Sequence, residues 1–546
     1  MGCPRWRHLD DGVDTVRRLF VARRGRSLAR IRIGRTHARI RTHNSSPETF
    51  YSRAAIDRMG APTTKADSRL TTTSINAAVV AAEYAVRGPI VARAAELEKA
   101  LQKDPSSVPF DKVVYCNIGN PHSLGQKPIT FFRQTLAAID CASLTSDDEV
   151  ARKLFPRDVL ERAKEATTMI KGGTGAYSES KGVEVLRKRV AKGITKRDGH
   201  AASSDDIFLI DGASAGCHYL MNVMIRNIDD AVLCPIPQYP LYSAACTLYG
   251  GTLVPYYLDE ETAWSLDIEH LKKQTEDARA AGKNVRALVV INPGNPTGNV
   301  LSDQNLLDIA TYCAEENILL IADEVYQENI YQDGLTFTSM RKIVLDAGLQ
   351  SKVALASFQS ISKGYYGECG RRGGYMELIG NWDQGVLDAI LKLCSIALCP
   401  NLAGQVTTSL VMDPPTEGEP SYELYASERD NILSSLKRRS IKLVEGLRKL
   451  EGITCQDAQG AMYAFPNLTF PQKFLDECAA AGKVADAVYC SKLLEATGIV
   501  TVPGSGFGQK PGSWHFRTTF LPSEADIDGV VVKFTNFHQA FMASYK

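Results

Sequence analysis

A lysine surrounded by hydroxyls, glycines and two arginines is the strongest chemical signal in this chain. Lys363 follows Ser360 and Ser362, and Arg371 and Arg372 come shortly after it. A lysine amine attacks an aldehyde only after losing its proton, and burial or neighbouring cations favour that loss. Hydroxyls and an arginine guanidinium suit a phosphate dianion. The segment therefore predicts a reactive lysine beside a phosphate, although the same composition would also fit a solvated loop.

A carboxylate and two hydrogen-bonding side chains follow apolar runs elsewhere in the chain. Asp323 ends the run at residues 318–322, and a buried aspartate is costly unless it pairs with a cation. A protonated pyridine nitrogen is such a cation, and the pairing makes the ring an electron sink. Tyr326 and Asn295, the latter in a Pro- and Gly-rich turn, could both bond a phenolic oxygen on that ring. These residues predict a site for a charged heterocycle.

Two further segments could complete a site for a phosphorylated ring. Ala213 and Ser214 open a helix directly after an apolar run, where free backbone N–H groups favour phosphate. Ser214 could instead act only as the helix N-cap. Tyr239 follows the next apolar run, and its ring could stack on a flat heterocycle or simply pack in a Pro-rich loop.

Short apolar runs alternate with helical stretches between residues 205 and 380. This alternation predicts an α/β domain with a mainly parallel sheet, covered on both faces. Ligands bind beyond the carboxyl ends of such strands, so the residues above are expected at one edge. The predicted strands are residues 207–210, 231–234, 288–291, 318–322, 353–356 and 514–520, and the predicted helices are residues 76–101, 422–450 and 486–497.

Composition narrows the classes of function. The 546 residues include 63 basic and 62 acidic side chains, so the whole molecule offers no general attraction to nucleic acid or acidic membranes. No apolar stretch approaches the length of a membrane span. The 13 cysteines form no pair or cluster at zinc spacing, so we expect neither a metal nor a disulfide framework.

The first residues differ from the rest of the chain. Residues 1–42 hold twelve arginines, no lysine and three acids. Residues 1–65 are therefore interpreted as an extension, either disordered or a mitochondrial presequence. The mitochondrial matrix is the expected compartment on the second interpretation, whereas translation from Met59 would give a shorter, cytoplasmic product.

Several motifs, in this order, resemble the fold type I aminotransferases, which use pyridoxal 5′-phosphate, and most closely their alanine aminotransferase branch. The resemblance runs from about residue 75 to the C-terminus. Its segments are Asn117-Ile-Gly-Asn-Pro, Gly125-Gln-Lys-Pro-Ile-Thr-Phe-Phe-Arg133, Gly175-Ala-Tyr177-Ser, Pro235-Ile-Pro-Gln-Tyr-Pro-Leu-Tyr242, Ser362-Lys-Gly-Tyr-Tyr-Gly-Glu-Cys-Gly370 and His515-Phe-Arg517-Thr.

The resemblance implies an architecture and an assembly. A large cofactor-binding domain with a mainly parallel seven-stranded sheet would occupy residues 125–400. A smaller α/β domain would come from both termini, with residues 66–124 supplying an arm and part of that domain and residues 401–546 the remainder. A homodimer is also implied, in which Tyr177 would reach the phosphate of the other subunit.

The resemblance also assigns roles around the cofactor. Lys363 would form the Schiff base and then move the α-proton of the substrate. Asp323 would hold the pyridine nitrogen. The phenolic oxygen would be bonded by Asn295 and Tyr326, the ring would stack on Tyr239, and the phosphate would lie against Ala213, Ser214, Ser360 and Arg372, with Ser362 and Arg371 left open.

The implied substrates are small amino acids and 2-oxo acids. Arg517 would clamp the α-carboxylate, which suits a two-pronged guanidinium, and the backbone of Gly119 would approach the same group. The expected reaction converts L-alanine and 2-oxoglutarate into pyruvate and L-glutamate. Glutamate–glyoxylate aminotransferases share nearly all these motifs and remain the alternative. A non-catalytic regulatory protein is a remote one, because no helix-turn-helix pattern accompanies the Arg-rich start.

Overall fold

The computed structural model describes residues 70–84 and 88–546, which belong to one compact unit. The Arg-rich extension and Met59 lie outside the described residues. The prediction of a targeting segment therefore stays a prediction.

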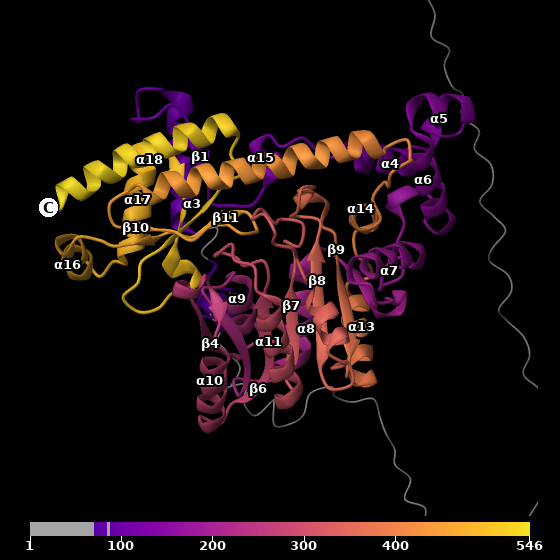
Figure 1. The fold of residues 1–546 in the computed structure, drawn as a ribbon, viewed down its shortest axis with the longest axis horizontal. Coiled ribbons are helices and arrows are strands. Elements are labelled where there is room, and N and C mark those ends of the chain that lie inside the picture. Colours follow the sequence, from indigo (N-terminus) through magenta and orange to yellow (C-terminus); the bar gives the residue numbers. More distant parts are fainter. Residues whose placement is uncertain (1–69, 85–87) are drawn as a thin grey trace, which may run out of the picture. The chain divides into compact units, whose positions relative to one another are not determined.

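An eight-stranded sheet forms the centre of the larger part of this unit (Figure 1). Strands β9 and β5 run antiparallel to their neighbours, and the other six are parallel, which confirms the predicted mainly parallel sheet. In spatial order the strands are β2 (Ile207–Ile210), β9 (Gly374–Gly380), β8 (Ala354–Ser360), β7 (Leu319–Asp323), β6 (Asn284–Ile291), β3 (Asp230–Ile236), β4 (Thr252–Asp259) and β5 (Ser265–Leu266).

The sheet has eight strands where seven were expected. The additional strand is β5, which is two residues long and folds back on the end of β4, with Leu266 opposite Leu258. Such a short edge strand needs no apolar run of its own. For this reason the sequence pattern does not reveal it.

Both faces of the sheet are covered by helices, as the apolar strands predict. In β3, Ala231 and Leu233 face one helical layer, whereas Val232 and Cys234 face the other, because successive strand residues point to opposite sides. The first layer contains α10 (Ile268–Ala280), α11 (Asp303–Glu316) and α12 (Met340–Asp346). The second contains α8 (Ala213–Met224), α9 (Leu241–Leu248) and α13 (Gln384–Ile396).

A smaller α/β part combines segments from both ends of the described chain. β1 (Val114–Tyr115) pairs in parallel with β13 (Ile499–Val500), although nearly the whole described chain separates them. A three-stranded sheet of β11 (Tyr463–Ala464), β15 (Phe516–Thr519) and β14 (Val502–Pro503) lies nearby in the same part. β10 (Ile453–Thr454) and β12 (Asn467–Leu468) form a further pair. The helices here are α3 (Pro89–Lys103), α16 (Gln472–Ala480), α17 (Ala485–Thr497) and α18 (Glu524–Ser544).

A group of helices covers the β2–β9 edge of the large sheet. Its members are α4 (Thr130–Asp140), α5 (Asp148–Leu154), α6 (Arg157–Met169), α7 (Glu184–Asp198) and α14 (Leu402–Met412). Helices α7 and α14 approach closely because Gly193 has no side chain: a Cβ there would lie 2.1 Å from the carbonyl oxygen of Met412. The long α15 (Tyr422–Arg448) runs from this group to α18 (Figure 1).

The predicted helix over residues 76–101 is wrong as a single element. The structure has two helices there, α2 (Ala77–Ala81) and α3, which begins at Pro89. Proline has no backbone N–H and is favoured at the first position of a helix, so Pro89 starts α3 and no single helix runs through it from residue 76. The predicted helices over residues 422–450 and 486–497 and the strand over 514–520 are confirmed as α15, α17 and β15.

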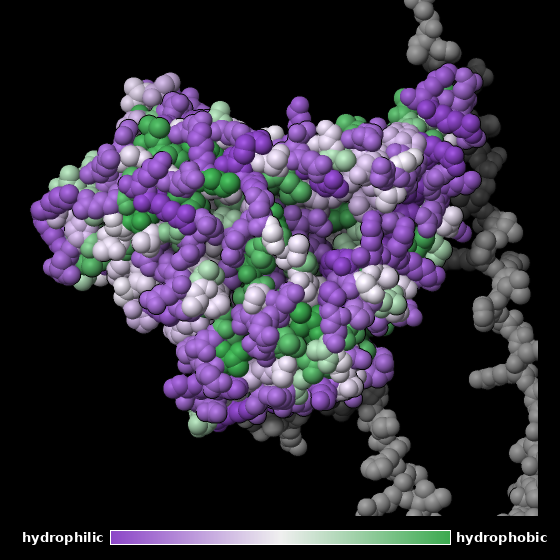
Figure 2. Space-filling model, viewed as in Figure 1, coloured by the Kyte–Doolittle hydropathy of each residue, from purple (hydrophilic) through white to green (hydrophobic). Residues whose placement is uncertain are grey.

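Hydrophilic side chains predominate on the face shown in Figure 2, with hydrophobic ones interspersed among them. Within residues 70–84 and 88–546, no helix has the length and apolar character needed to cross a membrane. The same residues contain no His, Cys, Asp and Glu grouping that could hold a metal ion.

Candidate active site

The candidate residues gather beyond the carboxyl ends of the parallel strands. Asp323 is the last residue of β7 and lies opposite Ile291, the last residue of β6. Lys363 follows the neighbouring strand β8, and Asn295 follows β6. Because parallel strands end at a common edge, the fold brings these side chains to one place. These side chains therefore gather at one edge of the sheet, as predicted.

Asp323 presents one satisfied and one unsatisfied oxygen. Its carboxylate is 4% exposed, and Oδ2 accepts a hydrogen bond from the hydroxyl of Tyr242 at 2.7 Å. No described group bonds Oδ1. Burial raises the pKa of the Asp323 carboxyl above its ordinary value, although the Tyr242 hydroxyl, the backbone N–H of Val325 and the Lys363 ammonium act in the opposite direction. A cationic N–H donor, such as a pyridinium, fits this buried oxygen.

An anion cradle lies at the N-terminus of α8. The Arg372 guanidinium donates to the carbonyl of Asp211 at 2.8 Å and to the hydroxyls of Ser362 at 3.2 Å and Ser214 at 3.4 Å. Gly212 leaves room for it, because a Cβ there would lie 2.5 Å from Nη2 of Arg372. The first N–H groups of a helix have no intrahelical acceptor, so this arrangement suits a phosphate.

The structure distinguishes the two neighbouring arginines. Nε of Arg371 lies 3.3 Å from the buried carboxylate of Glu368, which Arg133 also contacts at 2.9 Å. Arg371 is thus engaged away from the cradle, and Arg372 is the arginine that reaches Ser214.

The two serine hydroxyls make different contacts. The hydroxyl of Ser360 donates to the carbonyl of Gly373 at 3.3 Å, so Ser362 is the serine that contacts Arg372. The interpretation of Ser214 as an N-cap is wrong, because the cap residue is Gly212, whose positive φ of 79° turns the chain into α8.

Lys363 is half-buried, and its ammonium points at a backbone carbonyl. Nζ donates to the oxygen of Gly119 at 3.3 Å and lies 5.8 Å from the ring centre of Tyr326. A Cβ on Gly119 would lie 2.9 Å from Nζ, so only glycine permits this approach. The hydroxyl of Tyr326 in turn lies 2.9 Å from that of Tyr463.

Arg517 is a buried guanidinium, 1% exposed. Nη1 donates to Oδ1 of Asn295 at 3.0 Å, and Nη2 donates to the carbonyl of Asn117. Its guanidinium carbon lies 4.2 Å from the ring centre of Tyr463 and 4.7 Å from that of Phe507. Nε has no hydrogen-bond partner among the described residues, so this buried cation keeps an N–H group free to donate to a ligand. A carboxylate fits it.

The two remaining tyrosines behave differently. Tyr239 is half-buried, and its hydroxyl shares a 2.6 Å hydrogen bond with that of Tyr84, an arm residue that the sequence motifs do not include. Tyr177 follows a short turn at Gly173–Gly175 and is 81% exposed. The fold of one chain therefore does not enclose Tyr177 within the group around Lys363.

Sequence reasoning missed Tyr242 and Tyr463 as members of the site. Tyr242 ends the Pro-rich motif that contains Tyr239, but no role was predicted for it. Tyr463 lies in a segment with no motif, and its contact with Tyr326 arises only when the two parts of the fold meet. No spacing in the sequence could have indicated it.

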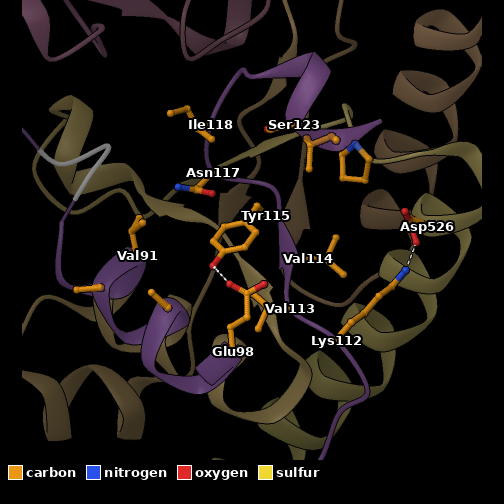
Figure 3. A pocket seen from close by; sticks show the side chains of 14 residues that line it. Val91, Glu98, Lys112, Val113, Val114, Tyr115, Asn117, Ile118, Ser123 and Asp526 are labelled. Carbon is orange, nitrogen blue, oxygen red and sulfur yellow. Dashed lines mark hydrogen bonds and ion pairs between the residues drawn. The ribbon is translucent and has the colours of Figure 1, made fainter. Parts of the chain in front are cut away.

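A cavity of about 920 Å³ lies beside the segment that carries Gly119 (Figure 3). Figure 3 shows Tyr115 donating to Glu98, at 3.0 Å, and the ion pair of Lys112 with Asp526. Among its lining residues only Asn117 contacts Arg517. The cavity adjoins the candidate site without containing Lys363 or Asp323.

Comparison with known proteins gives concordant results. The family model of class I and II aminotransferases matches residues 147–534. Alanine aminotransferase 2 of Panicum miliaceum is 54% identical over 475 residues, covering 87% of this chain and 98% of that relative. The mitochondrial alanine aminotransferase 1 of Arabidopsis thaliana is 53% identical, covering 87% of this chain and 88% of that relative. Glutamate–glyoxylate aminotransferase 2 of Arabidopsis thaliana is 45% identical, covering 86% of this chain and 96% of that relative.

A solved structure described as alanine aminotransferase from Pyrococcus furiosus superposes with a TM-score of 0.68 at 25% identity. It covers 85% of this chain and all of the other. The similarity therefore extends over both parts of the fold.

Proposed function

The chain belongs to the class I and II aminotransferases, and on this basis we propose that it transfers the amino group of L-alanine to 2-oxoglutarate, yielding pyruvate and L-glutamate. Pyridoxal 5′-phosphate is the cofactor of this family. Relatives of 53% and 54% identity that match over most of their length carry the alanine aminotransferase name. The observation that carries the chemistry is the buried, unpartnered Oδ1 of Asp323, which fits a pyridinium N–H.

When bound, pyridoxal phosphate supplies an aldehyde that captures amino groups and a ring that accepts the electrons of a broken Cα–H bond. In the proposal Asp323 holds the ring nitrogen protonated, because its charge is buried and otherwise half satisfied. Tyr242 keeps that carboxylate in place through Oδ2. Asp323 would thereby preserve the electron-accepting character of the bound ring.

Lys363 is the proposed carrier of the cofactor and of the mobile proton. Its Nζ is held at the carbonyl of Gly119, so the amine stays beside the reacting centre when it is free. In that position it can take the α-proton of an amino acid and return a proton in the second half-reaction. Tyr326 and the amide nitrogen of Asn295 are the proposed donors to the phenolic oxygen. Asn295 suits this because its Oδ1 already faces Arg517.

The proposed phosphate site is the cradle at the N-terminus of α8. Arg372 brings a charge, the backbone of Ala213 and Ser214 brings the first-turn N–H groups, and Ser362 brings a hydroxyl. Tyr239 is the proposed stacking partner of the ring. Ser360, whose hydroxyl bonds the carbonyl of Gly373, is a further proposed phosphate contact.

Arg517 is the proposed clamp for the substrate α-carboxylate. It is buried and packs against two aromatic rings, and its Nε has no hydrogen-bond acceptor among the described residues. The backbone of Gly119 lies at the same place, next to Lys363. A carboxylate bound here would present the Cα–H bond to the lysine amine.

We also propose a homodimer in which Tyr177 serves the cofactor of the partner subunit. The support is its exposure of 81%, which is unusual for so large an aromatic side chain. Ile396 and Leu398 are also exposed, by 74% and 55%, and apolar exposure of this kind is typical of surfaces that bind another chain. The division into domains at residues 66–124, 125–400 and 401–546 remains a proposal, supported by the pairing of β1 with β13.

A mitochondrial location is proposed from two lines of support. One is the Arg-rich composition of residues 1–42. The other is that several relatives, including the one from Arabidopsis thaliana at 53% identity, are named as mitochondrial. A product that begins at Met59 would instead stay in the cytoplasm.

The decisive experiment measures pyruvate released by the purified protein from L-alanine and 2-oxoglutarate in the presence of pyridoxal phosphate. Glutamate with glyoxylate is tested in parallel, because a relative with that name matches at 45% identity. Rapid pyruvate release with slower glyoxylate turnover is the expected result. Glyoxylate turnover alone would move the assignment to the second activity, and no turnover of either pair would contradict both.

A further inference from the structure

A tyrosine outside every sequence motif lies between the lysine and the arginine of the site. Tyr463 is in β11, is 2% exposed and pairs with Thr519 of β15. Paired residues of neighbouring strands point to the same face, and so do residues two apart in one strand. Tyr463 and Arg517 are therefore diagonal neighbours on one face of the three-stranded sheet.

The ring of Tyr463 supports the guanidinium of Arg517. The distance from the guanidinium carbon to the ring centre is 4.2 Å, within the range of a cation–π contact. Phe507 provides a second ring at 4.7 Å. With Asn295 and Asn117 holding the Nη atoms, these rings fix the direction in which the arginine presents its remaining donor.

The hydroxyl of Tyr463 lies at the other end of the same side chain, beside Lys363. A Cβ on Gly119 would be 2.8 Å from this hydroxyl oxygen and 2.9 Å from Nζ of Lys363, so both atoms converge on one glycine. The oxygen is also 2.9 Å from the hydroxyl of Tyr326. One side chain thus joins the proposed proton-transfer centre to the proposed carboxylate clamp.

Two cations lie close to the phenol of Tyr463. Burial disfavours its ionisation, but the Lys363 ammonium and the Arg517 guanidinium outweigh burial and lower the pKa of Tyr463. Burial raises the pKa of Tyr326 well above its ordinary value, and the half-buried Tyr239 is the remaining phenol that faces the pair. The two phenols therefore share one hydrogen bond in surroundings that favour the ionised form of Tyr463 over that of Tyr326.

We propose that Tyr463 is a positioning residue with two separable tasks: its ring seats Arg517 for the substrate carboxylate, and its hydroxyl orients Lys363 and Tyr326 for proton transfer. This inference rests on the proposed function, since it assigns those partners their roles. It deepens that function by adding a residue on which substrate affinity and turnover depend through different atoms.

Two substitutions separate the tasks in the cofactor-loaded enzyme. Tyr463→Phe keeps the ring and removes the hydroxyl, so kcat should fall about tenfold while the KM for L-alanine stays within about twofold. Tyr463→Leu removes the ring as well, so KM should also rise by about tenfold. Tyr489→Phe is the matched control, because its buried hydroxyl bonds His538 at 2.8 Å away from the site.

The pattern of the kinetic constants decides the proposal. Wild-type kcat in Tyr463→Phe, or an equal loss in kcat and in affinity in both Tyr463 variants, would overturn it. The proposed function fails in a different way, through a wild-type protein that binds no cofactor or transfers no amino group.

A spectroscopic measurement on the wild-type protein covers the case in which a variant does not fold. Tyrosinate absorbs in the near ultraviolet, and an ordinary phenol ionises near pH 10. Lys363 is a free ammonium only without cofactor, so an early fraction of the tyrosinate signal should form below that range in the cofactor-free wild type and in cofactor-free Tyr489→Phe, and should be missing from Tyr463→Phe. A wild-type titration without this early fraction contradicts the proposed surroundings of Tyr463.

Discussion

The hydroxyl of Tyr242 donates to Oδ2 of Asp323 at 2.7 Å, whereas Oδ1 of the same carboxylate has no partner among the described residues. Tyr242 comes from α9 and Asp323 from the end of β7, so a helix packed on the sheet fixes the carboxylate from one side. The other side is free to meet the cofactor. Because the proposed function uses only the free oxygen, the role of Tyr242 can be tested separately from that of Asp323.

Replacing Tyr242 by phenylalanine should shift the acid limb of the activity profile to higher pH. The hydroxyl stabilises the ionised carboxylate, so its loss raises the pKa of Asp323 further above the ordinary value. As pH falls, the carboxylate is then protonated at a pH up to about one unit higher than in the wild type. The measurement is kcat against pH, with Tyr256→Phe as control because its buried hydroxyl bonds only a backbone carbonyl at 2.6 Å. An acid limb that does not move would refute the role of Tyr242.

The adjacent arginines should differ in their effect on cofactor binding. Arg372→Ala removes the guanidinium of the phosphate cradle, so the Kd for pyridoxal phosphate should rise by about 10- to 100-fold. Arg371→Ala should leave it within about twofold, because that side chain pairs with Glu368 instead. Titration of the apoenzyme, followed by cofactor absorbance, measures both constants. Equal losses in the two variants would contradict the assignment.

Arg517→Lys should raise the KM for L-alanine while retaining the positive charge. Lysine cannot offer two parallel N–H groups to a carboxylate, and the expected increase is about 10- to 100-fold. Steady-state kinetics with both substrates measure it. Arg439→Lys is the control, since Arg439 is also buried but donates to the carbonyls of Leu521 and Pro522. An unchanged KM in Arg517→Lys would exclude the clamp.

Subunit complementation tests the proposed dimer. Lys363→Ala and Tyr177→Ala should each be nearly inactive as purified homodimers. A hybrid dimer of the two should recover up to about half of the wild-type activity, because one of its two sites then combines an intact Lys363 with an intact Tyr177. Activity is measured after the two variants are unfolded and refolded together. Failure of the mixture to exceed the separate variants would place Tyr177 outside the partner's site.

Glu324→Gln should stabilise the protein at high pH and have little effect at low pH. Glu324 is 3% exposed, and burial raises its pKa to about 8. A carboxyl whose folded-state pKa is raised stabilises the fold fully below its unfolded value and loses that contribution as pH rises through 8. The glutamine cannot ionise and can still accept the backbone N–H of Met340, which Glu324 accepts at 2.7 Å.

The free energy of unfolding in urea measures this effect. We expect the variant to exceed the wild type by about 2 kcal/mol at pH 8 and to match it near pH 4.5. A difference of the same size at both pH values would show that the ionisation of Glu324 is not its cause.

Much of the site could be predicted because its residues stand at the ends of apolar strands. Asp323 and Asn295 follow runs that read plainly as buried strands, and the topology then brings them to one edge. Lys363 and Arg372 follow β8 in the same way. Local pattern and fold agree at these positions, so sequence alone located them.

Other features depend on contacts that no local pattern contains. Tyr463 meets Tyr326 only where the smaller part of the fold closes over the sheet. The choice between Arg371 and Arg372 depends on Glu368, which captures the first of them. Pro89 is a local signal for the break between α2 and α3. In the prediction, the helical periodicity of the apolar residues outweighed this signal.

The pairing of β1 with β13 sets an order of assembly during synthesis on the ribosome. Val114 emerges early and can donate to the carbonyl of Gly498 only after nearly the whole chain has been made. The large sheet, whose strands lie between these segments, has its complete sequence available first. Domains tend to fold as their residues emerge. The N-terminal segment that carries Gly119 therefore cannot take its final place until the segment that carries Arg517 has been made. A ribosome that stalls late would therefore carry the folded surroundings of Arg372, the proposed phosphate site, before Arg517 has been added.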